Sequence, residues 1–190
     1  YLMPDGVGFV LAAFILKQKI IKRITGYDIH KYFLNLANKK SLKVFYFGSS
    51  IDTLENIKEK NTKRFPKLDA MYYSPPFKKV FLESDNMLFK KIINEFSPDI
   101  LFVGMTAPKQ EKWVYENYKS INCKVFISIG AVFDFYSNKI KRPHIFFQKL
   151  GLEWLIRFIN EPKRLFIRNF ISLPIFIKDL FLEFIKFKWI

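Results

Sequence analysis

Short runs of apolar residues alternate with amphipathic stretches along the first 140 residues. Three of these runs end at a glycine and precede a helix-like segment: Val44–Gly48, Ile100–Gly104 and Val125–Gly130. Continuous apolar runs are typical of strands buried on both faces, and their alternation with helices is typical of a parallel sheet. A weaker strand is expected at Ala70–Tyr73 and a helix at Val7–Lys17.

The pattern changes after about Arg142, where strand signals stop. Helix-like segments are expected at 146–159, 163–170 and 175–188. In the last of these, Asp179, Glu183 and Lys186 recur at helical spacing and leave a broad aromatic face elsewhere on the helix. Charges in the middle of this run oppose a membrane span, so the helix suits a membrane interface or a partner helix.

The sequence therefore predicts an α/β fold with a Rossmann-like parallel sheet, flanking helices and a basic helical C-terminal appendage. We expect a nucleotide-sugar-binding catalytic core over residues 1–142 and a membrane-association appendage over residues 143–190. The chain begins at Tyr1 inside a strand-like run, so the core is expected to be incomplete at its N-terminus.

Composition narrows the classes of function. Of 190 residues, 32 are Lys or Arg and 17 are Asp or Glu, and half are apolar, which excludes intrinsic disorder. The single cysteine, Cys123, excludes a disulfide framework, and the two histidines argue against structural zinc. The net charge of +15 attracts phosphate on nucleic acid, anionic lipid or a nucleotide-activated substrate. Composition does not choose among these three.

Four glycines are expected at one rim of the sheet: Gly6, Gly48, Gly104 and Gly130. Ligands of open α/β sheets bind beyond the carboxyl ends of the strands, where glycine allows close approach and helix N-termini attract anions. Any one of these glycines could serve only a tight turn, but several at matching places favour a phosphate-bearing ligand. The segment 6–11 lacks the third glycine of a dinucleotide fingerprint, and no P-loop or nucleophile-elbow motif is present.

Several polar residues are candidates for this rim. Asp5 either caps the helix that starts near Val7, which its spacing favours, or acts as a general base. Lys109 and Gln110 are candidate donors to phosphate or sugar hydroxyls, Glu111 suits the helix dipole beside them, and Asp134 is a candidate acceptor for a sugar hydroxyl.

No Asp-x-Asp pair is present, so we expect no metal clamp for a leaving diphosphate. Arginines and helix N-termini would then stabilise it, and the tail supplies Arg157, Arg164 and Arg168. The alternative for these three residues is a solvated helix face.

These stretches together resemble the WecG/TagA/CpsF family of bacterial glycosyltransferases. The resemblance is carried, in order, by Pro4–Gly8, Arg23–Gly26 with Asp28, Phe47–Gly48, Ser74–Phe77, Pro98–Gly104, Pro108–Trp113, Gly130 with Phe133–Phe135, Lys141–Pro143, and Gly151–Trp154 leading to Arg157, Glu161, Pro162 and Arg164.

The resemblance implies an inverting, metal-independent transfer of a sugar (N-acetylmannosamine or a related hexose) from a UDP-sugar to an undecaprenyl-diphosphate-linked sugar, in surface polysaccharide or wall teichoic acid synthesis. It makes Asp5 the candidate base, in place of a cap, and Arg23, Gln110 and Asp134 ligands of the UDP-sugar. It also implies a tail docked on anionic lipid at the inner face of the plasma membrane, with its arginines over the diphosphate. No cofactor is expected, and self-association is left open.

Two other interpretations stay open. A member of this family that has lost activity would act as a membrane-bound scaffold for polysaccharide assembly. A nucleic-acid-binding module would use the +15 charge, but no recognised nucleic-acid motif is present and the Phe residues lie in apolar runs. We therefore expect no nucleic-acid partner.

Overall fold

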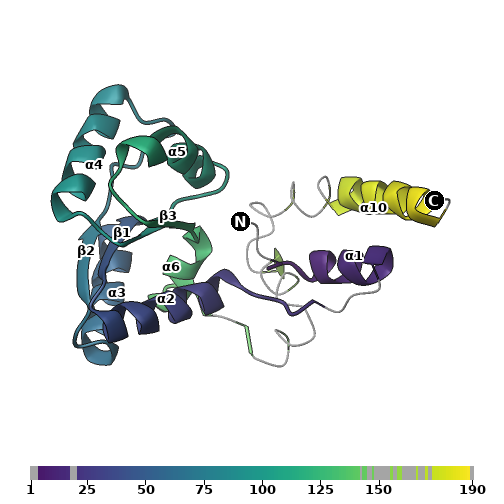
Figure 1. Ribbon diagram of the computed structural model, residues 1–190, viewed down its shortest axis with the longest axis horizontal. Helices are drawn as coiled ribbons and strands as arrows, with labels where there is room; N and C mark the ends of the chain where they lie inside the picture. Colours follow the sequence, from purple (N-terminus) through teal and green to yellow (C-terminus); the bar gives the residue numbers. More distant parts are fainter. Residues whose placement is uncertain are drawn as a thin grey trace. The chain divides into compact units, whose positions relative to one another are not determined.

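The structure, a computed structural model, describes residues 4–17, 21–141, 143–144, 147, 155, 158–159, 166, 170 and 173–188 (Figure 1). Its contacts divide the chain into two compact units, which are described separately below. The sheet unit is Gly26–Lys141, and the helical unit joins Tyr1–Thr25 with Arg142–Ile190. The functional division expected at residue 142 stays a prediction.

The sheet unit contains four parallel strands in the order β2-β1-β3-β4. They are β1 (Lys43–Gly48), β2 (Asp69–Tyr73), β3 (Ile100–Gly104) and β4 (Val125–Ser128). This confirms the predicted α/β class. The third apolar run ends as a strand two residues early because Gly130 already opens a helix.

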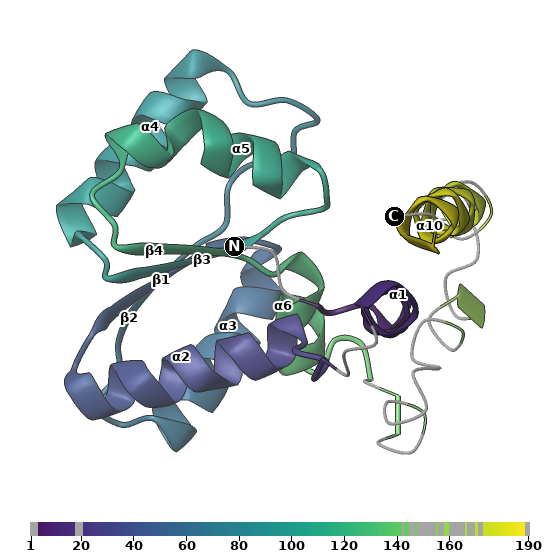
Figure 2. The same ribbon diagram turned by 45° about the vertical axis from the view of Figure 1, so that its right-hand side comes forward.

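Helices cover both faces of this sheet (Figure 2). The helices α2 (Gly26–Lys40), α3 (Ile51–Arg64) and α6 (Gly130–Tyr136) lie on one face, and α4 (Glu83–Phe96) and α5 (Lys109–Asn117) lie on the other. A short 3-10 helix, η1 (Tyr118–Ser120), follows α5. The start of α3 is fixed by Ser50, whose Oγ accepts a hydrogen bond from the Thr53 amide at 3.4 Å.

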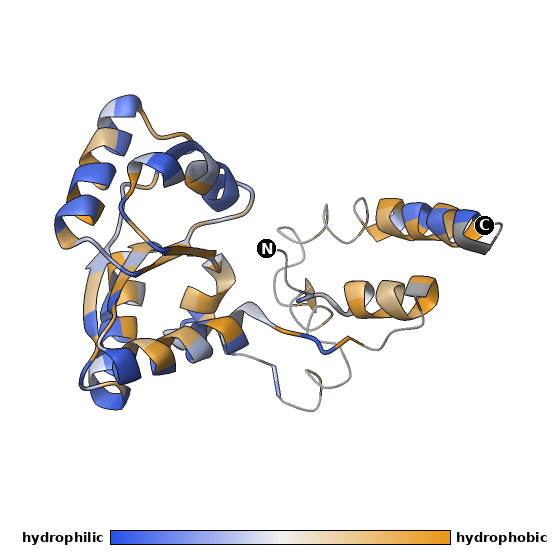
Figure 3. Ribbon diagram, in the orientation of Figure 1, coloured by the Kyte–Doolittle hydropathy of each residue, from blue (hydrophilic) through white to orange (hydrophobic). Residues whose placement is uncertain are grey.

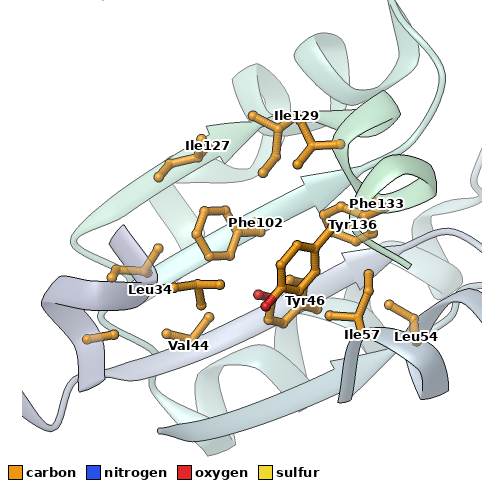
Figure 4. Packing of buried hydrophobic residues seen from close by; sticks show 13 residues of the cluster. Leu34, Val44, Tyr46, Leu54, Ile57, Phe102, Ile127, Ile129, Phe133 and Tyr136 are labelled. Carbon is orange, nitrogen blue, oxygen red and sulfur yellow. The ribbon is translucent and has the colours of Figure 1, made fainter. Parts of the chain in front are cut away.

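Each face of the sheet has its own apolar core. On the α2, α3 and α6 face, Tyr46 and Phe102 of the central strands pack among Leu34, Ile57 and Phe133 (Figure 4). The opposite face packs Phe45, Phe47, Leu101 and Val103 against side chains of α4 and α5, including Phe89 and Trp113. The central strands are thus buried on both faces, which explains their uninterrupted apolar sequence.

The helical unit contains α1 (Val7–Lys17) and α10 (Leu173–Lys188), which contact each other. The rings of Phe9 and Phe176 meet edge to face with their centres 5.7 Å apart. The helices expected at 146–159 and 163–170 fall mostly outside the described residues. Within the described part of the chain, no helix is both long and apolar enough to cross a bilayer.

Candidate functional site

The sheet unit has one topological switch point, between β1 and β3. The chain leaves β1 into α3 on one face and leaves β3 into α5 on the other, so the two carboxyl ends lie side by side with their helices diverging (Figure 2). Gly48 and Gly104 are partners in the register at this point. Open α/β sheets bind ligands at such a crevice.

The three glycines of this edge are required by the packing of the chain itself. Gly48 has a φ of +121°, and a Cβ there would lie 2.5 Å from the Gly104 carbonyl oxygen. A Cβ at Gly104 would collide with the Phe133 ring, and one at Gly130 with the Met105 carbonyl. Close approach of strand to strand and of α6 to the sheet therefore accounts for all three. Their contact with a ligand stays a prediction.

Gln110 lies buried at the start of α5 and joins two rim segments. Its Oε1 accepts hydrogen bonds from the amides of Gly130, at 3.0 Å, and Met105, at 3.3 Å. Its Nε2 donates to Glu111 Oε1 at 2.8 Å. The side chain expected to bind a ligand directly thus holds the exit of β3 against the start of α6, and Glu111 helps to orient it.

Lys109 is engaged by the loop of residues 74–82, which follows the carboxyl end of β2. Its Nζ donates to the Lys78 carbonyl and lies 3.6 Å from the centre of the Phe81 ring. Partial burial lowers the pKa of Lys109, and the Asp85 carboxylate opposes that shift. The predicted phosphate donor therefore fastens this loop to the start of α5.

Asp85, in the first turn of α4, also holds this loop in place. The sequence did not predict this role. Both of its carboxylate oxygens accept hydrogen bonds from Lys78 Nζ at 2.8 Å, and Oδ2 also accepts from the Leu82 amide at 2.9 Å. The lysine hydrogen bond, followed by the backbone one, holds the pKa of Asp85 below its ordinary value. The signal available in the sequence was an acidic residue seven positions after a lysine, in the first turn of the helix that follows the loop.

Asp134 lies half-buried in α6 of the same unit. Its carbonyl oxygen accepts hydrogen bonds from the Ile140 amide and the Ser137 hydroxyl, both at 3.1 Å. This carbonyl therefore helps to fix the turn that follows α6.

The helical unit brings Asp5 and Arg23 together. Arg23 Nε donates to the Asp5 carbonyl oxygen, and a guanidinium nitrogen lies 3.6 Å from Asp5 Oδ1. A backbone bond of 3.2 Å from the Ile24 amide to the Pro4 carbonyl joins the same two segments. Asp5 and Gly6 are exposed ahead of α1. The predicted base and a residue predicted to bind the UDP-sugar are thus neighbours. Arg157, Arg164 and Arg168 lie outside the described residues.

A buried cluster of polar side chains, which includes Tyr136 of α6, was not predicted from the sequence. The Tyr46 hydroxyl lies 2.8 Å from His30 Nε2 and accepts from Asn61 Nδ2 at 3.1 Å. Asn61 Nδ2 also donates to Tyr72 at 3.0 Å, and Asn61 Oδ1 accepts from Tyr136 at 2.9 Å. Burial lowers the pKa of His30 to about 3, so its imidazole is neutral at pH 7. The members lie on different elements, and no local pattern links them.

A cavity of about 260 Å³ adjoins this cluster and is lined by Tyr27, His30, Lys31, Leu34, Arg64, Phe65 and Tyr136. None of the predicted site residues lines it. Over the part of the chain that the structure describes, no group of three or more His, Cys, Asp or Glu side chains could hold a metal ion.

The chain is similar to a family of known proteins. The model of the glycosyl transferase WecG/TagA/CpsF family matches residues 1–189. The N-acetylglucosaminyldiphosphoundecaprenol N-acetyl-beta-D-mannosaminyltransferase of Bacillus subtilis (strain 168) is 32% identical over 175 residues, covering 92% of this chain and 65% of the relative. The Staphylococcus aureus (strain MRSA252) protein of the same name is 30% identical over 176 residues, covering 93% and 66%. The chain spans slightly less than two thirds of the length of these relatives.

Proposed function

Because this chain belongs to the glycosyl transferase WecG/TagA/CpsF family, we propose that it transfers a sugar, N-acetylmannosamine or a related hexose, from a UDP-sugar to a polyprenyl-diphosphate-linked sugar. The observation that carries the proposal is the family match over nearly the whole chain, through both units, together with the transferase activity in the names of its relatives. The switch point between Gly48 and Gly104 supports it, because such crevices suit nucleotides.

The proposed chemistry is a single displacement with inversion. An acceptor hydroxyl oxygen forms a bond to the anomeric carbon of the donor as the bond from that carbon to the UDP oxygen breaks. Asp5 takes the proton of the hydroxyl on its carboxylate, and the electron pair of the broken bond leaves with UDP. Arg157, Arg164 and Arg168 stabilise the charge that develops on the diphosphate, without a metal ion.

The remaining residues bind the donor in this proposal. Arg23 contacts the UDP-sugar and orients the Asp5 carboxylate beside it. The Asp134 carboxylate accepts a hydrogen bond from a sugar hydroxyl. Gln110 supports the donor site by holding the amides of Met105 and Gly130 in place. The reaction takes place at the inner face of the plasma membrane, with the basic C-terminal segment on anionic lipid.

A test combines donor binding with turnover. We expect UDP to bind the chain in calorimetric titration at physiological salt with EDTA present. Asp5→Asn should retain UDP binding and lower transfer to a lipid-linked acceptor by about 10²- to 10⁴-fold, because only proton abstraction is lost.

The matched control is Asp69→Asn, a carboxylate at the opposite, amino end of β2, which should leave transfer unchanged. Full turnover by Asp5→Asn would refute the assignment of the base. Failure of the folded chain to bind UDP would refute the proposed donor.

A further inference from the structure

The loop of residues 74–82 presents apolar side chains to solvent at the carboxyl edge of the sheet. Phe77 is fully exposed, and Val80 and Leu82 are 73% and 63% exposed. Figure 3 shows the end of this loop as a hydrophobic stretch that leads into α4. Lys79, also exposed, lies between Phe77 and Val80.

This exposure belongs to a loop that is held in place. Phe81, between Val80 and Leu82, turns inward and packs edge to face on Phe89 of α4, with ring centres 5.0 Å apart. Lys109 Nζ lies 3.6 Å from the centre of the Phe81 ring and donates a hydrogen bond to the Lys78 carbonyl.

The ion pair of Lys78 with Asp85 attaches the middle of the loop to α4. The fastening leaves Phe77, Val80 and Leu82 outside while Phe81 is anchored inside.

Apolar side chains interspersed with an exposed lysine match the headgroup region of an anionic bilayer, which accepts both. We propose that Phe77, Val80 and Leu82 insert into such a bilayer and turn the carboxyl edge of the sheet toward the membrane surface. The inference rests on the proposed function, in which the acceptor is carried by a membrane lipid. It assigns the sheet unit a membrane contact of its own, separate from the C-terminal segment.

The charges favour a bilayer over a second copy of the chain as the occupant. In a two-fold contact through this loop, the Lys79 side chains of the two copies would approach each other within an apolar interface. Each copy also carries the same net charge of +15. An anionic lipid surface has the opposite sign.

The experiment measures the depth of the loop directly in the full chain. Cys123 is the single cysteine, so Phe77→Cys in a Cys123→Ala background accepts one nitroxide label. The label is examined on vesicles of phosphatidylglycerol and phosphatidylethanolamine without donor or acceptor. Its collision rates with oxygen and with a water-soluble nickel chelate are compared, and Lys67→Cys, in the turn before β2, is the matched control.

We expect the label at position 77 to gain collisions with oxygen and lose those with nickel when vesicles are added, while the label at 67 stays in water. Phe77→Ser should weaken vesicle partitioning by roughly tenfold, and the control Tyr115→Ser, an exposed aromatic side chain on α5, should not.

A label at 77 that stays accessible to nickel on bound chain, or a chain that does not bind vesicles, would overturn the inference. Shielding of the label without vesicles, in proportion to protein concentration, would overturn it in favour of self-association. These readouts need no sugar transfer, so they are independent of the UDP and Asp5 tests.

Discussion

The central strands of the sheet unit and the helices α1 and α10 of the helical unit place phenylalanine in opposite environments. In the sheet unit, Phe45, Phe47 and Phe102 lie on the central strands and are inaccessible to solvent. In the helical unit, Phe9 and Phe14 of α1 and Phe181 of α10 are between 53% and 61% exposed. Abundance of phenylalanine therefore indicates no single role.

The difference follows from the number of layers. A strand between two layers of helices is covered on both faces, whereas two helices that pack together cover only one face of each other. Among the described residues, the apolar side chains of α1 and α10 that lie away from the contact between these helices stay exposed. Such exposure is typical of helices at a membrane interface. The core of the sheet unit explains its stability, and the exposed faces of the helical unit support the proposed lipid contact.

The sharpest test of this comparison is a pair of equal truncations. Phe102→Ala removes a ring from the centre of the sheet core and should lower the free energy of unfolding by about 3–5 kcal/mol. Phe181→Ala removes an exposed ring from α10 and should change it by less than about 0.5 kcal/mol. Urea titration followed by circular dichroism measures both.

Equal losses from the two substitutions would break the comparison, because they would show that Phe181 is packed as tightly as Phe102. As a further control, Phe14→Ala on α1 should behave like Phe181→Ala.

The second prediction concerns how stability depends on pH, and it assigns that dependence to a histidine of the sheet unit. The pKa of His30 in the folded chain, about 3, lies below its ordinary value of 6.5, so protonation favours the unfolded chain as the pH falls. The stability contributed by neutral His30 is complete above pH 6.5 and is lost at up to about 1.4 kcal/mol per pH unit on the way to pH 3. Between pH 6.5 and 4.5 we expect a loss of about 2–3 kcal/mol.

His30→Gln should flatten this part of the pH profile in urea titrations, because glutamine does not titrate. The control His144→Gln, at an exposed position of the helical unit, should retain the slope. The carboxylates Asp85 and Asp99 have pKa values lowered from 3.8, so the stability that they contribute is lost mainly below that pH, under most of this window. An unchanged slope in His30→Gln would contradict the assignment.

The fold of the sheet unit could be predicted because its strands carry their signal locally. Buried strands such as β1 and β3 need uninterrupted apolar runs, and their bounds follow the runs closely. The helices α2 and α4 were missed although α4 buries Phe89 and Ile93 four residues apart, which is helical spacing. No apolar run that ends in glycine precedes either helix, and such runs are the feature that predicts a following helix here.

The sequence predicted where several candidate residues lie in the sheet unit, but it did not predict the bonds that their side chains make. Gln110, Lys109 and the three glycines of the sheet unit (Gly48, Gly104 and Gly130) lie at the expected edge, but the bonding partners of the two side chains are set by the tertiary structure. Gln110 bonds an amide twenty residues away, and Lys109 bonds a carbonyl thirty-one residues away. A single sequence contains no local trace of such pairs, so side chains expected to bind a ligand were found bonded to the chain itself.

The smallest effect we predict compares a glycine from each unit. At Gly104 a methyl group would enter the Phe133 ring, which is itself fixed in the core, so Gly104→Ala should lower the free energy of unfolding by about 2 kcal/mol. At Gly8 a methyl group would lie 3.3 Å from one ring carbon of Phe176, on a half-buried side chain of α10, and alanine favours the helix by up to about 1 kcal/mol. Gly8→Ala should therefore leave stability unchanged or slightly raised in the same urea titration. A loss at Gly8 as large as that at Gly104 would mean that α1 and α10 are packed as closely as α6 and the sheet, and the contrast between the units would fail at its most local level.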